Sequence, residues 1–186
     1  MSKIIIGLVG QVACGKEAVK KYIAQKYNTE DCKFSNPLRD VVRRLDITES
    51  RENLQKLSTI LRGSFGEDIL AKVIAIDASK LKAEIVIIDG VRRMADIKFL
   101  KDLPNFYLIK VDADEKTRYE RMKARNENAG DSGKTFEQFL TDQNNEAEKE
   151  IPIVMDFAKI SIDNNGTLEE LYSKADRIIA EILSKY

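Results

Sequence analysis

The chain has 186 residues, with 31 basic and 31 acidic side chains, and its formal net charge is zero. The balanced charge argues against a broad nucleic-acid-binding face, and 43% hydrophobic with 33% charged residues excludes a disordered or membrane-embedded chain. The absence of histidine excludes histidine-based triads and histidine metal sites, and two cysteines are too few for a Cys₄ zinc site.

The first apolar run, residues 4–9, is too short for a signal-peptide core or a bilayer span. We therefore expect a cytoplasmic protein with no membrane partner, in which Cys14 and Cys32 remain reduced thiols. The length corresponds to about one domain of ordinary size, so residues 1–186 are expected to form a single domain.

Strands and helices are predicted to alternate along the chain. Apolar and β-branched runs predict strands at residues 4–9, 32–34, 85–88, 107–111 and 159–162. Helical spacing of apolar residues predicts helices at residues 16–27, 37–45, 51–62, 67–81, 95–100, 114–125, 135–157 with a break at Pro152, and 168–184. Thr167 and Glu170 have the spacing of a capping box, and the polar stretch 126–133 is expected to be an exposed mobile loop. The alternation predicts an α/β fold with a parallel sheet and helices on both faces.

A phosphate-binding loop is predicted between the first strand and the first helix. Residues 10–16 (GQVACGK) fit the pattern G-x-x-x-x-G-K in the strand–loop–helix context that this motif requires. Backbone N–H groups of such a loop and the positive end of the helix bind phosphate, and Lys16 can reach the β- and γ-phosphates. The loop residues expected around the nucleotide are Gly10, Val12, Ala13, Cys14, Gly15 and Lys16. An ordinary glycine-containing turn is the weaker alternative.

Position 17 departs from the motif, which has Ser or Thr there to bind Mg²⁺ through a hydroxyl. Glu17 offers a carboxylate instead, which is also a hard oxygen ligand for Mg²⁺. Two roles remain open at this point: Glu17 binds the metal, directly or through water, or it only complements the helix dipole.

A second group of polar residues follows the strand predicted at 85–88. Asp89 stands at the carboxyl end of that strand, where doubly wound folds bind ligands, and is predicted to orient Mg²⁺ or its water shell. Gly90 allows close approach of the backbone, and Arg92 offers a guanidinium fork for a phosphate. The alternative is a solvated polar turn, which suits Arg93 better.

Together these residues resemble the P-loop nucleoside monophosphate kinase superfamily over residues 4 to about 171. Deoxynucleoside monophosphate kinases are similar in the stretches 34–40 (FSNPLRD) and 51–58 (RENLQKLS). Archaeal adenylate-kinase-related proteins are similar in residues 61–71, 89–92, 117–125 and 164–170. Dephospho-CoA kinase is similar in the phosphate loop, in the pair Arg121 and Arg125 and in the asparagine–glycine turn.

The resemblance implies a three-layer α/β/α P-loop NTPase fold with a five-stranded parallel sheet, and ATP and Mg²⁺ as cofactors. It implies a helical acceptor-binding region at 35–80 and a short lid at 121–134. The residues that it places at the acceptor are Ser35, Arg39, Arg62, Asp89 and Arg92. The residues that it places at the nucleotide or the transferring phosphoryl group are Arg121 and Arg125, with Asn164 and Gly166 beside the donor base. The group expected to act in catalysis is Lys16, Arg92, Arg121 and Arg125. Surface ion pairing is the alternative for Arg121 and Arg125, and a solvated helix face is the alternative for Arg39 and Arg62.

The class of acceptor is predicted from residue 36. Dephospho-CoA kinases resemble this chain but use an aspartate after the second strand as a general base. Alignment on Leu38 places Asn36 there, and an amide cannot accept the proton. A nucleoside monophosphate is already an anionic nucleophile and needs no base.

We therefore expect ATP- and Mg²⁺-dependent phosphoryl transfer to a nucleoside or deoxynucleoside monophosphate. Two alternatives stay open: transfer to dephospho-CoA or another small metabolite, and a nucleotide-binding regulatory ATPase without transfer. The expected partners are small-molecule nucleotides rather than nucleic acid, and the chain is expected to be a monomer or a weak homodimer.

Overall fold

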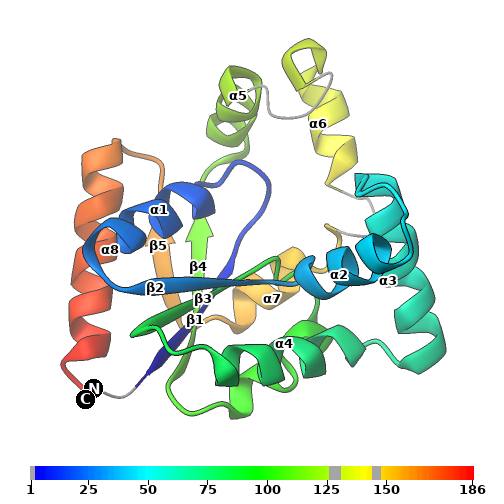
Figure 1. Ribbon diagram of the computed structural model, residues 1–186. Coiled ribbons are helices and arrows are strands. Elements are labelled where there is room, and N and C mark those ends of the chain that lie inside the picture. Colours follow the sequence, from blue (N-terminus) through cyan, green and yellow to red (C-terminus); the bar gives the residue numbers. More distant parts are fainter. Residues whose placement is uncertain (1–2, 126–130, 144–147) are drawn as a thin grey trace. The chain divides into compact units, whose positions relative to one another are not determined.

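The computed structural model describes residues 3–125, 131–143 and 148–186. Its strands are β1 (Ile4–Val9), β2 (Thr29–Lys33), β3 (Ile85–Asp89), β4 (Phe106–Asp112) and β5 (Ile160–Asp163). They form one parallel sheet in the order β2-β3-β1-β4-β5, with helices in the segments between the strands (Figure 1). The α/β class and the five-stranded parallel sheet predicted from the sequence are confirmed.

The burial of side chains explains which strands could be predicted correctly from the sequence. Every residue of β1 is buried, and so are Ile85–Ile88 in β3. A strand that is buried on both faces requires a continuous apolar run, and both segments have one. In β2, which lies at one edge of the sheet, only Cys32 is buried. The polar residues 29–31 were therefore not predicted to be part of the strand. The observed strand β2 begins at Thr29, whereas the predicted strand began at Cys32.

The chain divides into two compact units, which are described separately. The first unit comprises Leu8–Tyr27 and Leu108–Tyr186. Its helical elements are α1 (Lys16–Lys26), α5 (Glu115–Arg125), the 3₁₀ turn η3 (Asp131–Gly133), α6 (Phe136–Asp142), α7 (Ile151–Phe157) and α8 (Leu168–Leu183). Helices α1 and α8 pack together through the stacked rings of Tyr22 and Tyr172, whose centroids are 4.0 Å apart.

The second unit comprises the residues up to Gly7 together with Asn28–Tyr107. Its helical elements are α2 (Asn36–Arg44), α3 (Arg51–Phe65), α4 (Ile69–Lys80) and the 3₁₀ turns η1 (Met94–Ile97) and η2 (Leu100–Asp102). Strands β2 and β3 pair in parallel with Cys32 opposite Ile88. In this unit α4 contacts β2 and both 3₁₀ turns.

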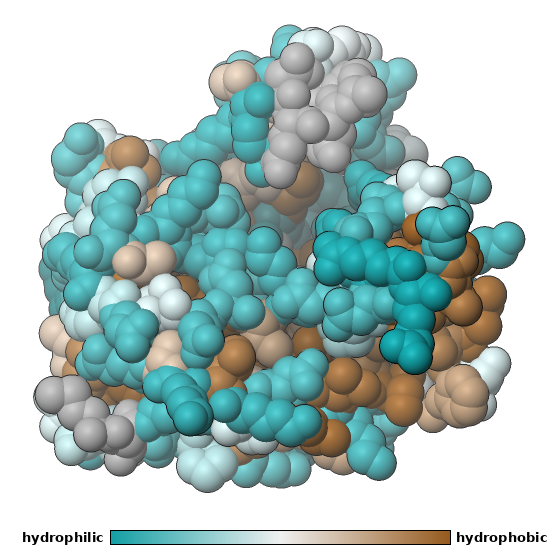
Figure 2. All heavy atoms as spheres, in the orientation of Figure 1, coloured by the Kyte–Doolittle hydropathy of each residue, from teal (hydrophilic) through white to brown (hydrophobic). Residues whose placement is uncertain are grey.

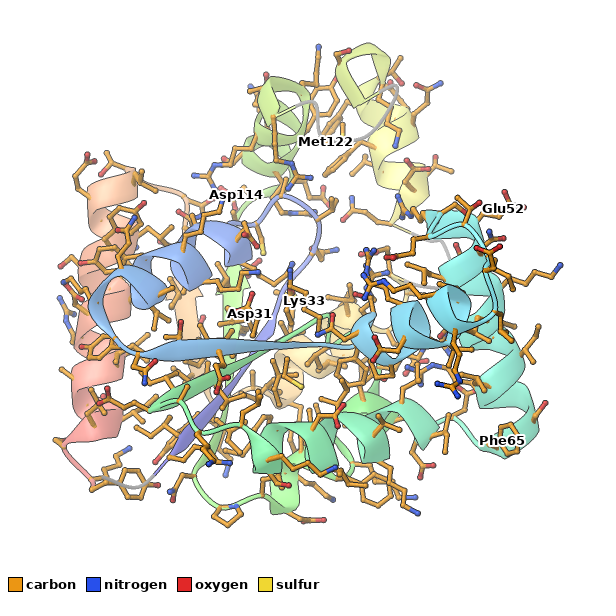
Figure 3. The ribbon with its side chains drawn as sticks, in the orientation of Figure 1. Asp31, Lys33, Glu52, Phe65, Asp114 and Met122 are labelled. Carbon is orange, nitrogen blue, oxygen red and sulfur yellow. The ribbon has the colours of Figure 1, made fainter. Side chains whose placement is uncertain are left out.

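Helix α3 has one buried side chain, and that side chain is charged. Among its residues only Arg62 is buried, whereas Ile60 and Phe65 are more than half exposed. Figure 2 shows hydrophobic atoms at the surface over this helix, and Figure 3 shows Phe65 at its outer end. Leu54, Leu57 and Leu61 form a half-buried apolar stripe at helical spacing, and Arg62 adds buried polar contacts beside it.

Two predicted helices differ from the observed elements. The helix predicted at 95–100 is replaced by the two 3₁₀ turns, because the Asp96 carboxylate accepts the backbone N–H groups of Arg92 and Arg93. The helix predicted at 135–157 is two helices, α6 and α7. Pro152 lies in the first turn of α7, where its missing N–H costs no helical hydrogen bond.

Other predictions at the helix ends are confirmed. Thr167 and Glu170 form the expected capping box: Thr167 donates its backbone N–H to Glu170 Oε2 at 3.0 Å, and Glu170 donates its backbone N–H to Thr167 Oγ1 at 3.2 Å.

The lid predicted at 121–134 and the mobile loop predicted at 126–133 fall partly on residues 126–130, which lie outside the described residues. Within the described ranges, no helix is both long enough and apolar enough to cross a bilayer.

Candidate functional site

The loop between β1 and α1 has a backbone that requires glycine at its two ends. Gly15 adopts φ 108°, and a Cβ there would lie 2.1 Å from Nδ2 of Asn164. At Gly10 a Cβ would lie 2.3 Å from the carbonyl oxygen of Val111. Both contacts are far closer than van der Waals packing allows, so these two motif positions accept no larger residue. The sequence pattern G-x-x-x-x-G therefore corresponds to a steric need in this fold.

Lys16 begins α1 and folds back over the loop. Its Nζ donates hydrogen bonds to the carbonyl oxygens of Gly10 and Gln11, the second at 3.1 Å. The ammonium group, the loop backbone and the N-terminus of α1 thus provide positive charge at one place. This combination is the arrangement that binds phosphate at helix N-termini. The remaining predicted loop residues, Val12 and Ala13, lie half-buried between the two glycines.

Asn164 connects the loop after β5 to the phosphate-binding loop. Its side chain is buried and donates through Nδ2 to the carbonyl oxygen of Cys14 at 2.8 Å. Its backbone N–H donates to the carbonyl oxygen of Asp112 at 2.7 Å. Arg121 Nη1 in turn donates to the Asn164 carbonyl oxygen at 2.8 Å. The structure therefore brings together Cys14, Asn164 and Arg121, which were predicted to surround the nucleotide.

The other residues predicted on the donor side have simpler surroundings. Gly166 is exposed directly before the capping residue of α8. Arg125 is exposed at the end of α5. Their roles at the donor base and at the transferring phosphoryl group stay predictions.

The predicted metal ligands belong to different units. Glu17 is exposed in the first turn of α1, and its carboxylate lies 2.8 Å from Nζ of Lys20 and 3.9 Å from Nζ of Lys21. Asp89 ends β3 in the second unit. In the described part of the chain, no three acidic or cysteine side chains form a group that could hold a metal ion. Mg²⁺ in kinases is bound through one or two carboxylates and the substrate phosphates, so Glu17 and Asp89 stay predicted ligands.

Arg118, which the sequence analysis did not select, is buried beside the phosphate-binding loop. It lies in the first turn of α5, which follows Asp114 (Figure 3), and only 1% of its surface is exposed. Its Nε donates to the carbonyl oxygen of Ala113 at 3.0 Å, and its Nη2 donates to Oε1 of Gln143 at 2.9 Å. Nη1 has no hydrogen-bond partner among the described residues. Burial lowers the pKa of Arg118 from its ordinary value.

One signal in the sequence could have identified Arg118. It lies four residues before Met122, and these two residues are the buried positions of α5. An arginine at a position where the helical spacing calls for an apolar side chain is a buried charge, and such a charge needs a partner or a function.

The turn after β3 is stabilised by a buried carboxylate. Asp96 is 1% exposed, and its Oδ2 accepts the backbone N–H groups of Arg92 at 2.9 Å and Arg93 at 3.0 Å. Gly90 in this turn has φ 91°. The backbone at Arg92 is thereby held in place next to Asp89 at the carboxyl end of β3, while the Arg92 side chain is exposed.

Two arginines predicted to bind the acceptor form ion pairs within the second unit. Arg62 donates from Nη2 to Asp96 Oδ1 at 2.7 Å and from Nη1 to the carbonyl oxygen of Glu67. Arg39 donates to Glu49 Oε2 at 2.6 Å. Ser35 precedes α2 but makes no side-chain capping bond. These contacts do not test binding of an acceptor phosphate, which stays a prediction for all three residues.

Solved structures with the same architecture include two shikimate kinases. Shikimate kinase from Bacteroides thetaiotaomicron superposes with a TM-score of 0.62 at 15% identity, covering 98% of this chain and 99% of that one. Shikimate kinase from Acinetobacter baumannii, solved in complex with shikimate, gives 0.53 at 16% identity, covering 99% and 95%. At these identities the likeness establishes the fold, and the predicted P-loop kinase fold is confirmed.

No family model matches the chain. Among curated proteins, a UPF0200 protein of Sulfurisphaera tokodaii is 30% identical over 181 residues, covering 96% of this chain and 97% of its own length. A UPF0200 protein of Methanoregula boonei is 29% identical over 179 residues, covering 94% and 95%. The matches extend over nearly the whole of each protein, and the chain belongs to the UPF0200 family.

Proposed function

We propose that this protein is a P-loop phosphotransferase, which binds ATP with Mg²⁺ and transfers the γ-phosphoryl group to a nucleoside or deoxynucleoside monophosphate. The observation that carries the proposal is the position of Lys16. Its ammonium group lies over a loop with two sterically required glycines at the start of α1. Phosphoryl transfer depends chiefly on positioning and on positive charge at the phosphates, and this loop supplies both.

In the proposed mechanism the first unit binds the donor. The backbone N–H groups of residues 10–15 and Lys16 hold the β- and γ-phosphates, and Lys16 leaves the Gly10 carbonyl oxygen to follow the moving phosphoryl group. Arg121, which contacts the Asn164 carbonyl oxygen beside the loop, would leave it to bind the nucleotide or the transferring phosphoryl group. A bound Mg²⁺ would neutralise phosphate charge, with Glu17 or Asp89 as the protein ligand or as the partner of its water shell.

The second unit is proposed to bind the acceptor. Arg92 is exposed on a turn that Asp96 holds rigid, which suits a guanidinium that must place a phosphate accurately. Asn36 begins α2 and is exposed. Its amide offers no base for a hydroxyl acceptor, whereas the phosphate of a nucleoside monophosphate is already anionic and needs none.

A small-metabolite kinase is the second candidate. It is favoured by the shikimate kinases and by a sugar kinase from Janibacter among the solved structures of this fold. This candidate predicts that a hydroxyl-bearing metabolite, such as dephospho-CoA, receives the γ-phosphoryl group of ATP with release of ADP, and that a base other than residue 36 accepts the hydroxyl proton.

The test is Mg²⁺-dependent formation of ADP from ATP, screened over ribo- and deoxyribonucleoside monophosphates and dephospho-CoA. We expect one monophosphate to raise turnover well above the rate without acceptor, and Lys16→Ala to abolish turnover without loss of the fold, as checked by circular dichroism. Stimulation by dephospho-CoA alone would support the second candidate. ATP binding with slow hydrolysis and no stimulation by any acceptor would favour a regulatory ATPase. Wild-type rates in Lys16→Ala would overturn the assignment of the loop.

A further inference from the structure

Arg118 is a buried cation, and one of its guanidinium nitrogens has no hydrogen-bond partner among the residues that the structure describes. Of its three guanidinium nitrogens, Nε contacts the Ala113 carbonyl oxygen and Nη2 contacts Gln143 Oε1, while Nη1 has no partner in the described part of the chain. Buried side-chain polar atoms nearly always have a partner, and an unmet buried donor is costly. An isolated Nη1 therefore calls for a ligand.

Among the described residues, no carboxylate lies within ion-pairing distance of the guanidinium. Glu115 and Asp112 act on it only through longer-range attraction, and burial outweighs that attraction. A cation inside the protein without a paired anion is unfavourable, because its hydration is lost and no opposite charge replaces it. The site therefore favours an anion over a neutral ligand.

The position of Arg118 connects it to the phosphate-binding loop. Gln143 Oε1 accepts a hydrogen bond from Arg118 and also one from Nε2 of Gln11, at 2.7 Å. Helix α5 and the end of α6 thus meet the loop through one shared oxygen atom.

We propose that Arg118 is an anion-binding group of the donor site, and that its Nη1 donates a hydrogen bond to a phosphate oxygen of the nucleotide held by the loop. This inference rests on the proposed function, because it takes the loop to be the phosphate site. It adds a binding residue beyond the arginines expected from the resemblance, Arg121 and Arg125. It also explains why Gln143, an uncharged group, stands beside the guanidinium. A carboxylate there would neutralise the charge that the phosphate requires.

The structure offers a pair of variants that separate charge from packing. Arg118→Met removes the charge and keeps a long apolar chain. Gln143→Glu keeps an oxygen that can accept both existing hydrogen bonds, from Gln11 and Arg118, and adds a negative charge. Arg177→Met is the matched control, because Arg177 is exposed on α8 and distant in sequence from the loop.

The experiment measures binding of inorganic tripolyphosphate and of ATP by calorimetry, and the melting temperature of the unliganded protein. We expect Arg118→Met to weaken tripolyphosphate binding at least tenfold while the protein still melts cooperatively, because the variant removes the charge that binds the phosphate. We expect Gln143→Glu to weaken binding and to raise the melting temperature, and Arg177→Met to change neither.

Wild-type tripolyphosphate affinity in folded Arg118→Met would overturn the inference. If that variant does not fold, Gln143→Glu decides: unchanged affinity in this variant overturns the inference. Lys16→Met separates this failure from failure of the proposed function. Binding that is lost in Lys16→Met but kept in Arg118→Met leaves the loop assignment intact and removes Arg118. No binding of tripolyphosphate or ATP by the wild-type protein would overturn both.

Discussion

Asn164 donates its side-chain amide to the carbonyl oxygen of Cys14 at 2.8 Å, across 150 residues of sequence. The amide lies in the space that the missing side chain of Gly15 leaves open. The loop after β5 therefore supports the phosphate-binding loop directly, and Arg121 contacts the same residue from α5. The shape of the predicted donor site depends on this single buried amide.

Replacing Asn164 by Ala should lower both stability and ATP affinity. The change leaves the Cys14 carbonyl oxygen without its buried donor, and the cost of such a loss is about 1–3 kcal/mol. Urea unfolding and ATP calorimetry are the measurements. Asn165→Ala is the control, because Asn165 is an exposed neighbour in the same turn. Equal effects of the two changes would contradict a special role for Asn164.

Replacement by alanine should change the stability of the protein in opposite directions at two glycines, Gly15 and Gly63. Gly15→Ala forces a Cβ against Asn164 in a left-handed backbone and should abolish ATP binding while lowering stability. Gly63→Ala, within α3, meets no atom within 4 Å and should raise stability by about 1 kcal/mol through helix propensity. Thermal melts with and without ATP test both. Retained ATP binding in Gly15→Ala would contradict the steric argument.

The pair Arg62 and Asp96 should stabilise the second unit and support the Arg92 turn. Asp96→Ala leaves the Arg62 guanidinium buried without its partner, which costs about 3–5 kcal/mol in comparable pairs. It also releases the backbone N–H of Arg92, so the KM for the acceptor should rise more than the KM for ATP. Urea unfolding and steady-state kinetics measure the two effects.

A double-mutant cycle provides the control for this pair. Asp96→Ala together with Arg62→Met should cost less than the sum of the two single changes, because the unpaired charge is gone. Arg43→Met, which removes an exposed partner of Glu49, should have a much smaller effect on unfolding. Additive single and double changes would show that the two side chains are not coupled.

Cys32 should make the folded protein less stable at alkaline pH. Burial raises the pKa of its thiol from an ordinary value of 9.0 to about 11. The folded state therefore holds this proton more tightly than the unfolded state. The free energy of unfolding that this difference contributes is complete below about pH 9 and is lost as the pH rises towards about 11. A difference of this size corresponds to about 2–3 kcal/mol.

The measurement is urea unfolding of wild type and Cys32→Ala between pH 8 and about pH 11. The variant should be less stable at neutral pH, since it lacks a buried side chain, but should lose less stability as the pH rises. Parallel curves for the two proteins would exclude Cys32 as the titrating group. The thiol should also react slowly with a thiol reagent at neutral pH, as long as the protein is folded.

Much of the fold and part of the site could be predicted from local patterns. The buried strands were visible because Ile4–Val9 and Ile85–Ile88 are apolar without interruption, and the last helix because Thr167 and Glu170 cap it. Edge strand β2 and the 3₁₀ turns were not predicted correctly. Their form depends on neighbours in space: the sheet edge for β2, and the Asp96 carboxylate for the turns.

The sequence by itself was enough to predict the phosphate-binding loop, because its glycines, its lysine and the following helix lie within one short segment. Only the tertiary structure decided what surrounds that segment. Asn164 donates a hydrogen bond to the carbonyl oxygen of Cys14, and Gln11 and Arg118 both donate to Gln143. Hydrogen bonds between residues so distant along the chain leave no periodicity or spacing in the sequence, because they form only once the strands and helices have packed together.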